Sequence, residues 1–328
     1  MKKSLRVIMA VVLVVAIAML AGCNKTETKE DTSSANREVS STVSESVDTV
    51  DSAEEDVKET NDESEVKPVI LVVSFGTSYN DTREKTIYAI ENRIADAYPD
   101  YEVRRAFTSQ IIIDKLKERD NLEIDNIEEA LERLVNDGVK TLIVQPTHIM
   151  SGYEYDDVVE AVESYRDKFD ELAIGAPLLT SDEDYESLAN AVVEETAEYN
   201  EDGTAIVFMG HGTEHEANAS YAKFQELFTA NGNDNYYIGT VEATPSIDDI
   251  VADLKEGSYT RVVLEPLMVV AGDHANNDMA GDEDDSWKSI LEGEGYEVEC
   301  VLKGLGEFES VQDIYVAHVN DAINSLGE

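Results

Sequence analysis

Residues 69–77 read Val-Ile-Leu-Val-Val-Ser-Phe-Gly-Thr, and residues 205–213 read Ala-Ile-Val-Phe-Met-Gly-His-Gly-Thr. Each stretch is an apolar run that ends in a Gly-Thr turn, which is typical of a buried parallel strand followed by a tight loop. A second pair repeats the pattern, because Leu-Ile-Val-Gln-Pro-Thr-His-Ile-Met-Ser-Gly (142–152) parallels Val-Leu-Glu-Pro-Leu-Met-Val-Val-Ala-Gly (263–272). The sequence therefore predicts one α/β unit that occurs twice.

Apolar runs alternate with amphipathic stretches along 67–328, which indicates parallel strands joined by crossover helices. We expect two similar lobes, 67–180 and 181–328, each a parallel sheet flanked by helices, with a cleft between them. The expected strands lie near 69–75, 102–107, 140–145, 172–176, 204–209, 236–241, 261–267 and 297–302. The expected helices lie near 81–97, 109–117, 126–137, 156–170, 183–199, 216–229, 246–254, 284–293 and 309–325.

The first 23 residues have the features of a bacterial lipoprotein signal peptide. Three cationic residues precede an apolar run over 7–19, and Leu-Ala-Gly-Cys follows at 20–23. The run is short for a membrane-spanning helix and ends in small residues. We expect cleavage before Cys23 and lipidation of its thiol, which would anchor an extracytoplasmic protein to the cell membrane. An ordinary signal peptide or an uncleaved anchor is the alternative.

Residues 24–66 are predicted to form a disordered acidic tether. They contain 14 acidic and 4 basic residues and no aromatic residue, so they cannot bury enough apolar surface to offset their ordering entropy. The remaining 67–328 carry 57 acidic and 18 basic residues, a net charge of −39. This charge argues against nucleic acid and anionic membrane surfaces as partners, and it favours a divalent cation.

Three candidate ligands follow predicted strands of the second lobe. His211 lies in Met-Gly-His-Gly-Thr (209–213), Glu242 in Val-Glu-Ala-Thr-Pro (241–245) and His274 in Val-Ala-Gly-Asp-His-Ala-Asn-Asn-Asp (270–278). Ligands of open α/β sheets bind beyond the carboxyl ends of the strands, where these side chains should meet. Two imidazoles and a carboxylate can hold a metal and accept protons. Taken singly, His211 could be a turn residue, and Glu242 and His274 could be helix caps.

The first lobe differs at the corresponding positions. Phe75 stands where the second lobe has His211, and we expect Phe107 to correspond to Glu242 and Glu154 to His274. The reactive set is therefore predicted to belong to the C-terminal lobe, with the N-terminal lobe supplying a wall.

These motifs resemble the CbiK-type sirohydrochlorin cobaltochelatases of the class II chelatase superfamily. The resemblance rests on Gly-His-Gly-Thr (210–213), Val-Glu (241–242) and the long stretch 267–281, and it extends to 74–78 and 106–109. It implies a two-lobed chelatase fold, a homo-oligomer, no prosthetic group, and insertion of Co²⁺ (or Fe²⁺) into the tetrapyrrole sirohydrochlorin. The predicted lipobox departs from the many cytoplasmic members, which puts the physiological tetrapyrrole in question.

The resemblance also assigns roles to the three candidate ligands. His211 and His274 correspond to the family's metal-site histidines, and Glu242 corresponds to its active-site glutamate. Imidazoles bind Co²⁺, Fe²⁺ or Zn²⁺ well, and an incomplete protein shell leaves positions for the pyrrole nitrogens. We therefore expect both histidines to hold the metal and accept pyrrole protons, with Glu242 assisting.

Sirohydrochlorin is a polycarboxylate, so an acidic protein needs local cations to bind it. The candidates are Arg83, Lys85, Arg104 and Arg105, because arginine in particular pairs with carboxylates in a bidentate way. The alternative is that they pair with the abundant neighbouring Asp and Glu. Two more histidines are ambiguous: His148 could line the cleft or pack in its wall, and His215 could bind metal or begin a helix.

A second function stays open at this point. A tethered two-lobed α/β lipoprotein could instead bind haem, another tetrapyrrole or metal for transport without catalysis. Stoichiometric ligand uptake without metal insertion would distinguish that class from a chelatase.

Overall fold

A computed structural model describes residues 66–327, which belong to one compact unit, Asp62–Glu328. The predicted signal peptide with Cys23, and the predicted tether up to residue 65, lie outside the described residues. In the described part of the chain, no helix combines the length and apolar character that a membrane crossing requires.

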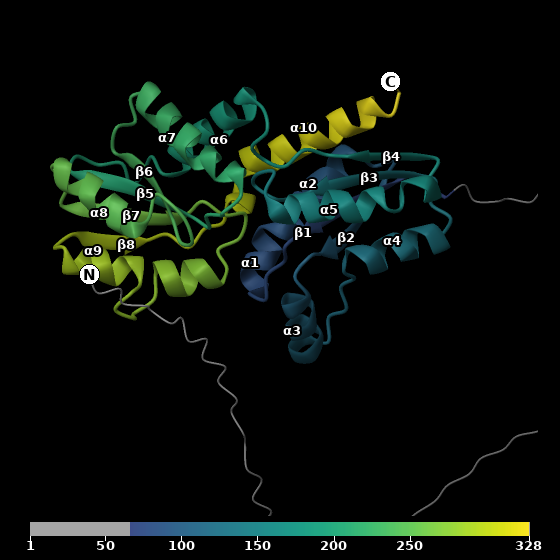
Figure 1. Cartoon of the computed structure of the whole chain (residues 1–328), viewed down its shortest axis with the longest axis horizontal. Coiled ribbons are helices and arrows are strands. Elements are labelled where there is room, and N and C mark those ends of the chain that lie inside the picture. Colours follow the sequence, from purple (N-terminus) through teal and green to yellow (C-terminus); the bar gives the residue numbers. More distant parts are fainter. Residues whose placement is uncertain (1–65, 328) are drawn as a thin grey trace, which may run out of the picture. The chain divides into compact units, whose positions relative to one another are not determined.

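Within residues 66–327, eight strands form two four-stranded parallel sheets with the same strand order (Figure 1). The first sheet has the order β2-β1-β3-β4, and the second has the order β6-β5-β7-β8. The predicted repeat is thus a repeat of topology, and the predicted two-lobed parallel α/β fold is confirmed. The strands are β1 (Val69–Ser74), β2 (Glu102–Phe107), β3 (Thr141–Pro146), β4 (Glu171–Ile174), β5 (Thr204–Gly210), β6 (Tyr236–Thr240), β7 (Arg261–Pro266) and β8 (Glu297–Cys300).

Helices connect the strands, as the crossover rule for parallel sheets requires. Several predicted helices differ in their bounds: the first is divided at Thr86, the one expected over 156–170 occupies Tyr153–Glu163, and the one expected from 284 begins at Trp287. The α-helices are α1 (Asn80–Lys85), α2 (Ile87–Ala97), α3 (Gln110–Asp120), α4 (Ile127–Asn136), α5 (Tyr153–Glu163), α6 (Asp182–Glu195), α7 (Ala219–Ala230), α8 (Ile247–Glu256), α9 (Trp287–Gly293) and α10 (Glu309–Ser325). Short 3-10 turns occupy Arg166–Lys168, Glu216–Asn218 and Leu305–Glu307, and a π-helical turn occupies Ala275–Met279.

One hydrophobic core joins the two sheets. Alternate residues of the central strands, such as Ile70 of β1 and Phe208 of β5, belong to a single buried cluster. The intervening residues, such as Leu71 and Val207, belong to separate clusters on the other face of each sheet. Because successive side chains of a strand point to opposite faces, each sheet is buried on both sides, which explains the near-continuous apolar runs.

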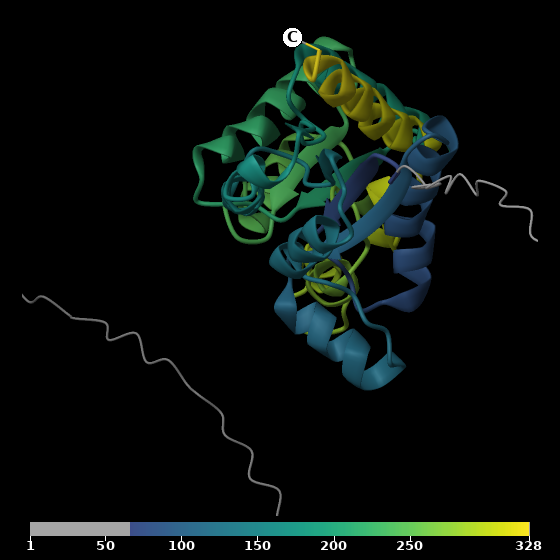
Figure 2. The same cartoon turned by 90° about the vertical axis from the view of Figure 1, so that its right-hand side faces the viewer.

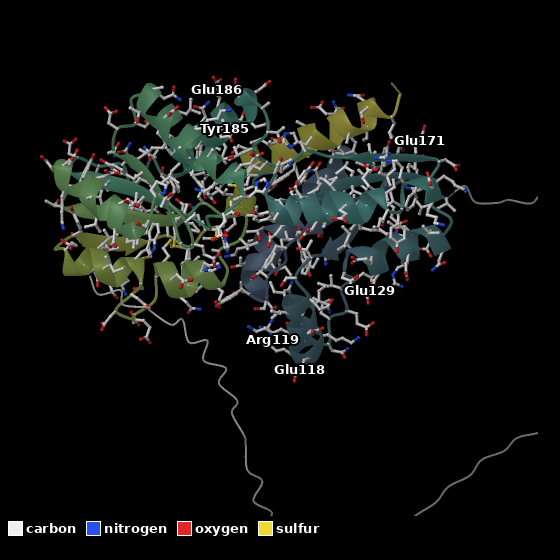
Figure 3. The ribbon with its side chains drawn as sticks, in the orientation of Figure 1. Glu118, Arg119, Glu129, Glu171, Tyr185 and Glu186 are labelled. Carbon is white, nitrogen blue, oxygen red and sulfur yellow. The ribbon has the colours of Figure 1, made fainter. Side chains whose placement is uncertain are left out.

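The helix that follows each sheet packs against the other lobe. Helix α6 follows β4 and packs on α7, where Tyr185, labelled in Figure 3, meets Phe224 edge to face. Helix α10 follows β8 and packs on the first lobe beside α2 (Figure 2). The Tyr315 hydroxyl of α10 donates to the Thr147 carbonyl at 2.8 Å. The boundary predicted at 180/181 therefore separates the sheets, while α10 lies against the lobe on the other side of it.

Candidate metal centre

The three predicted ligands of the second lobe come together beyond the ends of β5, β6 and β7. His211, Glu242 and His274 each offer one ligand atom, and these atoms all lie within 4.8 Å of one another. His211 Nδ1 is 3.9 Å from Glu242 Oε2, and the two imidazole rings meet edge to face with centroids 4.8 Å apart. Within residues 66–327, this is the one group of three or more His, Cys, Asp or Glu side chains with such spacing.

The turn around His211 requires glycine on both sides. Gly212 has φ +84°, and a Cβ there would lie 2.8 Å from the Ala243 nitrogen. A Cβ on Gly210 would lie 2.4 Å from the ring of Tyr221. The loop can therefore approach the loop after β6 closely, and the Glu242 N–H donates to the His211 carbonyl at 2.9 Å. This backbone bond fixes two of the three ligands relative to each other.

His274 is oriented by a carboxylate that the sequence did not single out. Its Nδ1 lies 2.7 Å from Oδ2 of Asp278, four residues along the π-helical turn. A ligating histidine commonly donates its second ring N–H to such a carboxylate, which fixes the tautomer and ring orientation. The four-residue spacing of His274 and Asp278 could have suggested this contact, but only if a helical turn had been predicted there.

The site is open on the side away from the sheet. The side chains of His211 and Glu242 are 49% and 58% exposed, and that of His274 is 33% exposed. Two imidazoles and one carboxylate make an incomplete shell for a divalent first-row metal, with positions left for other donors. The donor set would therefore leave a bound divalent metal open to further ligands.

The strand register corrects one predicted match between the lobes. Ser74 pairs with Phe107 in the first sheet, as Gly210 pairs with Thr240 in the second. Phe107 therefore corresponds to Thr240, and the counterpart of Glu242 lies two residues further on. The predicted match was wrong because pairing with the central strand sets the register, and the apolar pattern does not show that pairing.

Two of the predicted carboxylate-binding cations are held in ion pairs of the first lobe. Arg104 contacts Glu102 and Asp137, and Arg105 forms a bidentate contact with Glu91. Burial raises the pKa of the Glu91 carboxyl, although the guanidinium of Arg105 opposes that shift. Both arginines thus adopt the alternative that the sequence left open, pairing with neighbouring acids.

The other two candidates differ from each other in exposure. Arg83 is buried, with Nη1 donating to the Thr77 carbonyl at 3.2 Å and Nε donating to the Tyr88 hydroxyl at 3.1 Å. Lys85, at the end of α1, is exposed. Of the four residues predicted to bind carboxylates, Lys85 is the one that is exposed and has no ion-pair or hydrogen-bond partner within residues 66–327.

His215 lies outside the group formed by His211, Glu242 and His274 (the trio). It caps the start of a 3-10 turn. Its Nδ1 accepts from the Ala217 N–H at 3.0 Å, and its Nε2 lies 3.5 Å from Asp156 of α5. The ring also meets Tyr153 edge to face at 4.8 Å. The first turn of α5 in the first lobe therefore lies against the loop of the second lobe that carries His211 and His215.

Comparison with known proteins identifies the family. Residues 68–324 match the model of the cobalt chelatase (CbiK) family. The chain belongs to this family. A sirohydrochlorin cobaltochelatase of Salmonella typhimurium is 42% identical over 263 residues, which cover 80% of this chain and 99% of that protein. Sirohydrochlorin cobaltochelatase CbiKC of Nitratidesulfovibrio vulgaris is 35% identical over 264 residues, which cover 80% and 93%. The resemblance read from the sequence is confirmed, and the protein is a metal chelatase.

The solved structures agree on the fold. SirB from Bacillus subtilis with Fe³⁺ aligns with a TM-score of 0.58 at 14% identity, covering 80% of this chain and 98% of that one. SirB from Bacillus subtilis subspecies spizizenii in complex with cobalt aligns with a TM-score of 0.55 at 13% identity, with the same coverage. At this identity the likeness concerns the two-lobed architecture alone.

Proposed function

We propose that this cobalt chelatase family member inserts Co²⁺ into sirohydrochlorin at the centre formed by His211, Glu242 and His274. The observation that carries the proposal is the convergence of these three donors within 4.8 Å at the open edge of the second sheet. The activity named for both curated relatives supports it. Co²⁺ is a substrate here, and Fe²⁺ is the alternative metal with the same donor preference.

The hydrogen bonds of the two histidines determine which nitrogen is available to the metal. His211 Nδ1 lies 2.9 Å from the Gly212 carbonyl, and His274 Nδ1 lies 2.7 Å from the Asp278 carboxylate. Carbonyl and carboxylate oxygens accept, so each Nδ1 carries the proton and each Nε2 carries the lone pair. Both imidazoles can then offer Nε2 to the metal.

Proton removal requires a further acceptor. An imidazole that binds the metal through Nε2 and keeps its proton on Nδ1 cannot accept a pyrrole proton at the same time. Glu242 is the third member of the centre and its side chain is 58% exposed, so its carboxylate can take a proton and release it to water. We therefore assign proton transfer chiefly to Glu242 while the histidines hold the metal.

A metallation assay tests this proposal. Purified protein is mixed with sirohydrochlorin and Co²⁺ without oxygen, and metal insertion is followed spectrophotometrically. We expect H211A and H274A to lower the rate by about 100-fold or more, the scale of losing a positioned catalytic group. His215→Ala is the matched control, because it removes an imidazole from the same loop but outside the trio, and we expect it to retain the wild-type rate.

The outcomes separate the two functions considered from the sequence. Multiple turnovers that depend on both histidines support a chelatase, whereas stoichiometric tetrapyrrole uptake without insertion would support a binding protein. Unchanged rates in both variants would contradict the assigned roles. Parallel assays with Fe²⁺ and Ni²⁺, and with protoporphyrin, define the metal and the macrocycle.

We propose in addition that the enzyme acts outside the cytoplasm, anchored through lipidated Cys23. The support is the Leu-Ala-Gly-Cys sequence directly after an apolar run at 7–19. Fractionation of cells that produce wild-type or Cys23→Ala protein, after labelling with a radioactive fatty acid, tests it. We expect label in the membrane fraction for the wild type alone; equal label in both would contradict the anchor.

A further inference from the structure

A second histidine–carboxylate pair lies in the first lobe. His148 follows β3, Glu154 lies in the first turn of α5, and His148 Nε2 is 3.8 Å from Glu154 Oε2. This spacing is too long for a hydrogen bond. Two donors bound to one ion, each about 2.1 Å from it, lie roughly 3–3.5 Å apart, so a small closure would suit a shared cation.

His148 is buried without a hydrogen-bond partner. Its side chain is 8% exposed, and neither ring nitrogen has a partner in the described structure. His318, the other strongly buried histidine, contrasts with it, because both of its ring nitrogens face acceptors on Ala176 and Asp184. Buried polar groups are normally paired, so an unpaired imidazole requires an explanation. Burial lowers the pKa of His148 to about 4, which keeps the ring neutral and its lone pair available.

The surroundings of Glu154 suit a hydrated cation. Glu154, Asp157 and Glu128 line a cavity of about 280 Å³, together with Phe75 and Thr108. None of the described residues that line it is cationic, and the buried hydroxyl oxygen of Thr108 has no partner. Six water molecules occupy about 180 Å³ at roughly 30 Å³ each, so an ion with its hydration shell fits. A carboxylate of the macrocycle would be repelled by the three acidic side chains.

The helical turn that carries Glu154 also contacts the second lobe, in the loop that follows His211. Burial raises the pKa of the Glu154 carboxyl and Asp157 adds to that shift, whereas His211 opposes it. Asp156 and Tyr153 of the same helical turn lie against His215. A cation at Glu154 would therefore lie on the side of the first lobe that meets the loop carrying His211 and His215.

We propose that Glu154 and His148 form a second binding site for a divalent cation, which the hydrated metal substrate occupies before it reaches His211, Glu242 and His274. Glu154 is half exposed and meets the incoming ion, and His148 stands behind it as the nitrogen donor. The delivery role rests on the proposed chelatase function. The binding of a cation at this pair does not depend on it.

Titration of Co²⁺ alone into the full-length protein tests the site. Binding is followed by calorimetry and by the visible absorption of Co²⁺, without tetrapyrrole. We expect the H211A/H274A double variant to retain one Co²⁺ equivalent. Adding E154Q or H148M to that background should weaken it at least about tenfold, as loss of a metal-site partner does. Glu160→Gln is the matched control, because it removes one exposed carboxylate from the same helix, and it should leave the equivalent intact.

The results distinguish failure of this inference from failure of the proposed function. Equal losses in E154Q and E160Q, or no Co²⁺ equivalent in the double variant, would overturn the second site even if H211A and H274A abolish metallation. The wild-type protein could instead bind the Co²⁺ equivalent that E154Q weakens but never insert metal into sirohydrochlorin. That result would support the second site and refute the chelatase role. Because H148M replaces a buried side chain, its melting curve is measured to test whether the variant is folded. E154Q replaces an exposed side chain and provides an independent measurement of the site.

Discussion

His274 Nδ1 lies 2.7 Å from Oδ2 of Asp278, so the ring is held by a carboxylate one helical turn away. The contact depends on the π-helical turn over Ala275–Met279, which begins directly after His274. Because π turns are rare and are often found at functional sites, the local geometry and the donor role of His274 support each other. The carboxylate also makes the imidazole a stronger donor toward a metal.

Asp278→Asn should weaken Co²⁺ binding at the trio by about 10- to 100-fold. The amide is nearly the same size but carries no charge, so it orients the ring less firmly and lowers its basicity. Calorimetric titration of Co²⁺ into the E154Q background isolates the trio. Asp282→Asn is the control, since that carboxylate pairs with Lys288 on the surface, and an equal loss there would refute the specific role of Asp278.

Gly212→Ala should destabilise the fold by about 2 kcal/mol or more and displace His211. The position combines φ +84° with a Cβ that would lie 2.8 Å from the Ala243 backbone nitrogen. Gly232→Ala is a matched control, because Gly232 has φ +80° but nothing within 4 Å of its added Cβ, and only about 1 kcal/mol is expected. Urea unfolding measures both. Similar losses would show that the close approach of the two loops is unimportant.

Glu265→Gln should stabilise the protein at pH 8 by removing a buried carboxyl. Glu265 is 2% exposed, Oε2 has no partner, and burial raises its pKa to about 8. The folded state keeps this proton to a higher pH than the unfolded state, so stability is full below pH 4.5 and falls as the pH rises to 8. Gln145, which precedes Pro146 as Glu265 precedes Pro266, shows that an amide fits this position of the repeat.

Unfolding free energies at several pH values between 4.5 and 8 check this prediction. The difference between variant and wild type isolates Glu265 from the other titrating groups. The Glu265→Gln advantage should grow with pH across that window. An advantage that is the same at all pH values would mean that the proton on Glu265 is unimportant.

The sequence predicted those features that depend on local pattern. Val69–Ser74 and Thr204–Gly210 were found because both strands are continuous apolar runs. The trio was found because parallel strands bring their carboxyl ends to one edge. The pairing of Arg105 with Glu91 could not be predicted, since it depends on how α2 lies on β2, and one strongly acidic chain offers many partners. The π-helical turn depends on hydrogen bonds that no residue type specifies.

His148→Met should stabilise the protein, and the gain should grow as the pH falls. An unpaired buried polar ring costs about 1–3 kcal/mol, and Met fills a similar space without polar nitrogens. Because burial lowers the pKa of His148 from 6.5 to about 4, the stability associated with its neutral ring is present above pH 6.5 and is lost as the pH falls toward 4. H148M removes that loss, so its advantage at pH 4.5 should exceed its advantage at pH 7.5 by about 2 kcal/mol. Chemical denaturation at the two pH values measures the difference. A stabilised variant that has lost the second Co²⁺ equivalent would show that the chain keeps His148 for a ligand and not for packing, whereas a destabilised variant would assign the ring to the core.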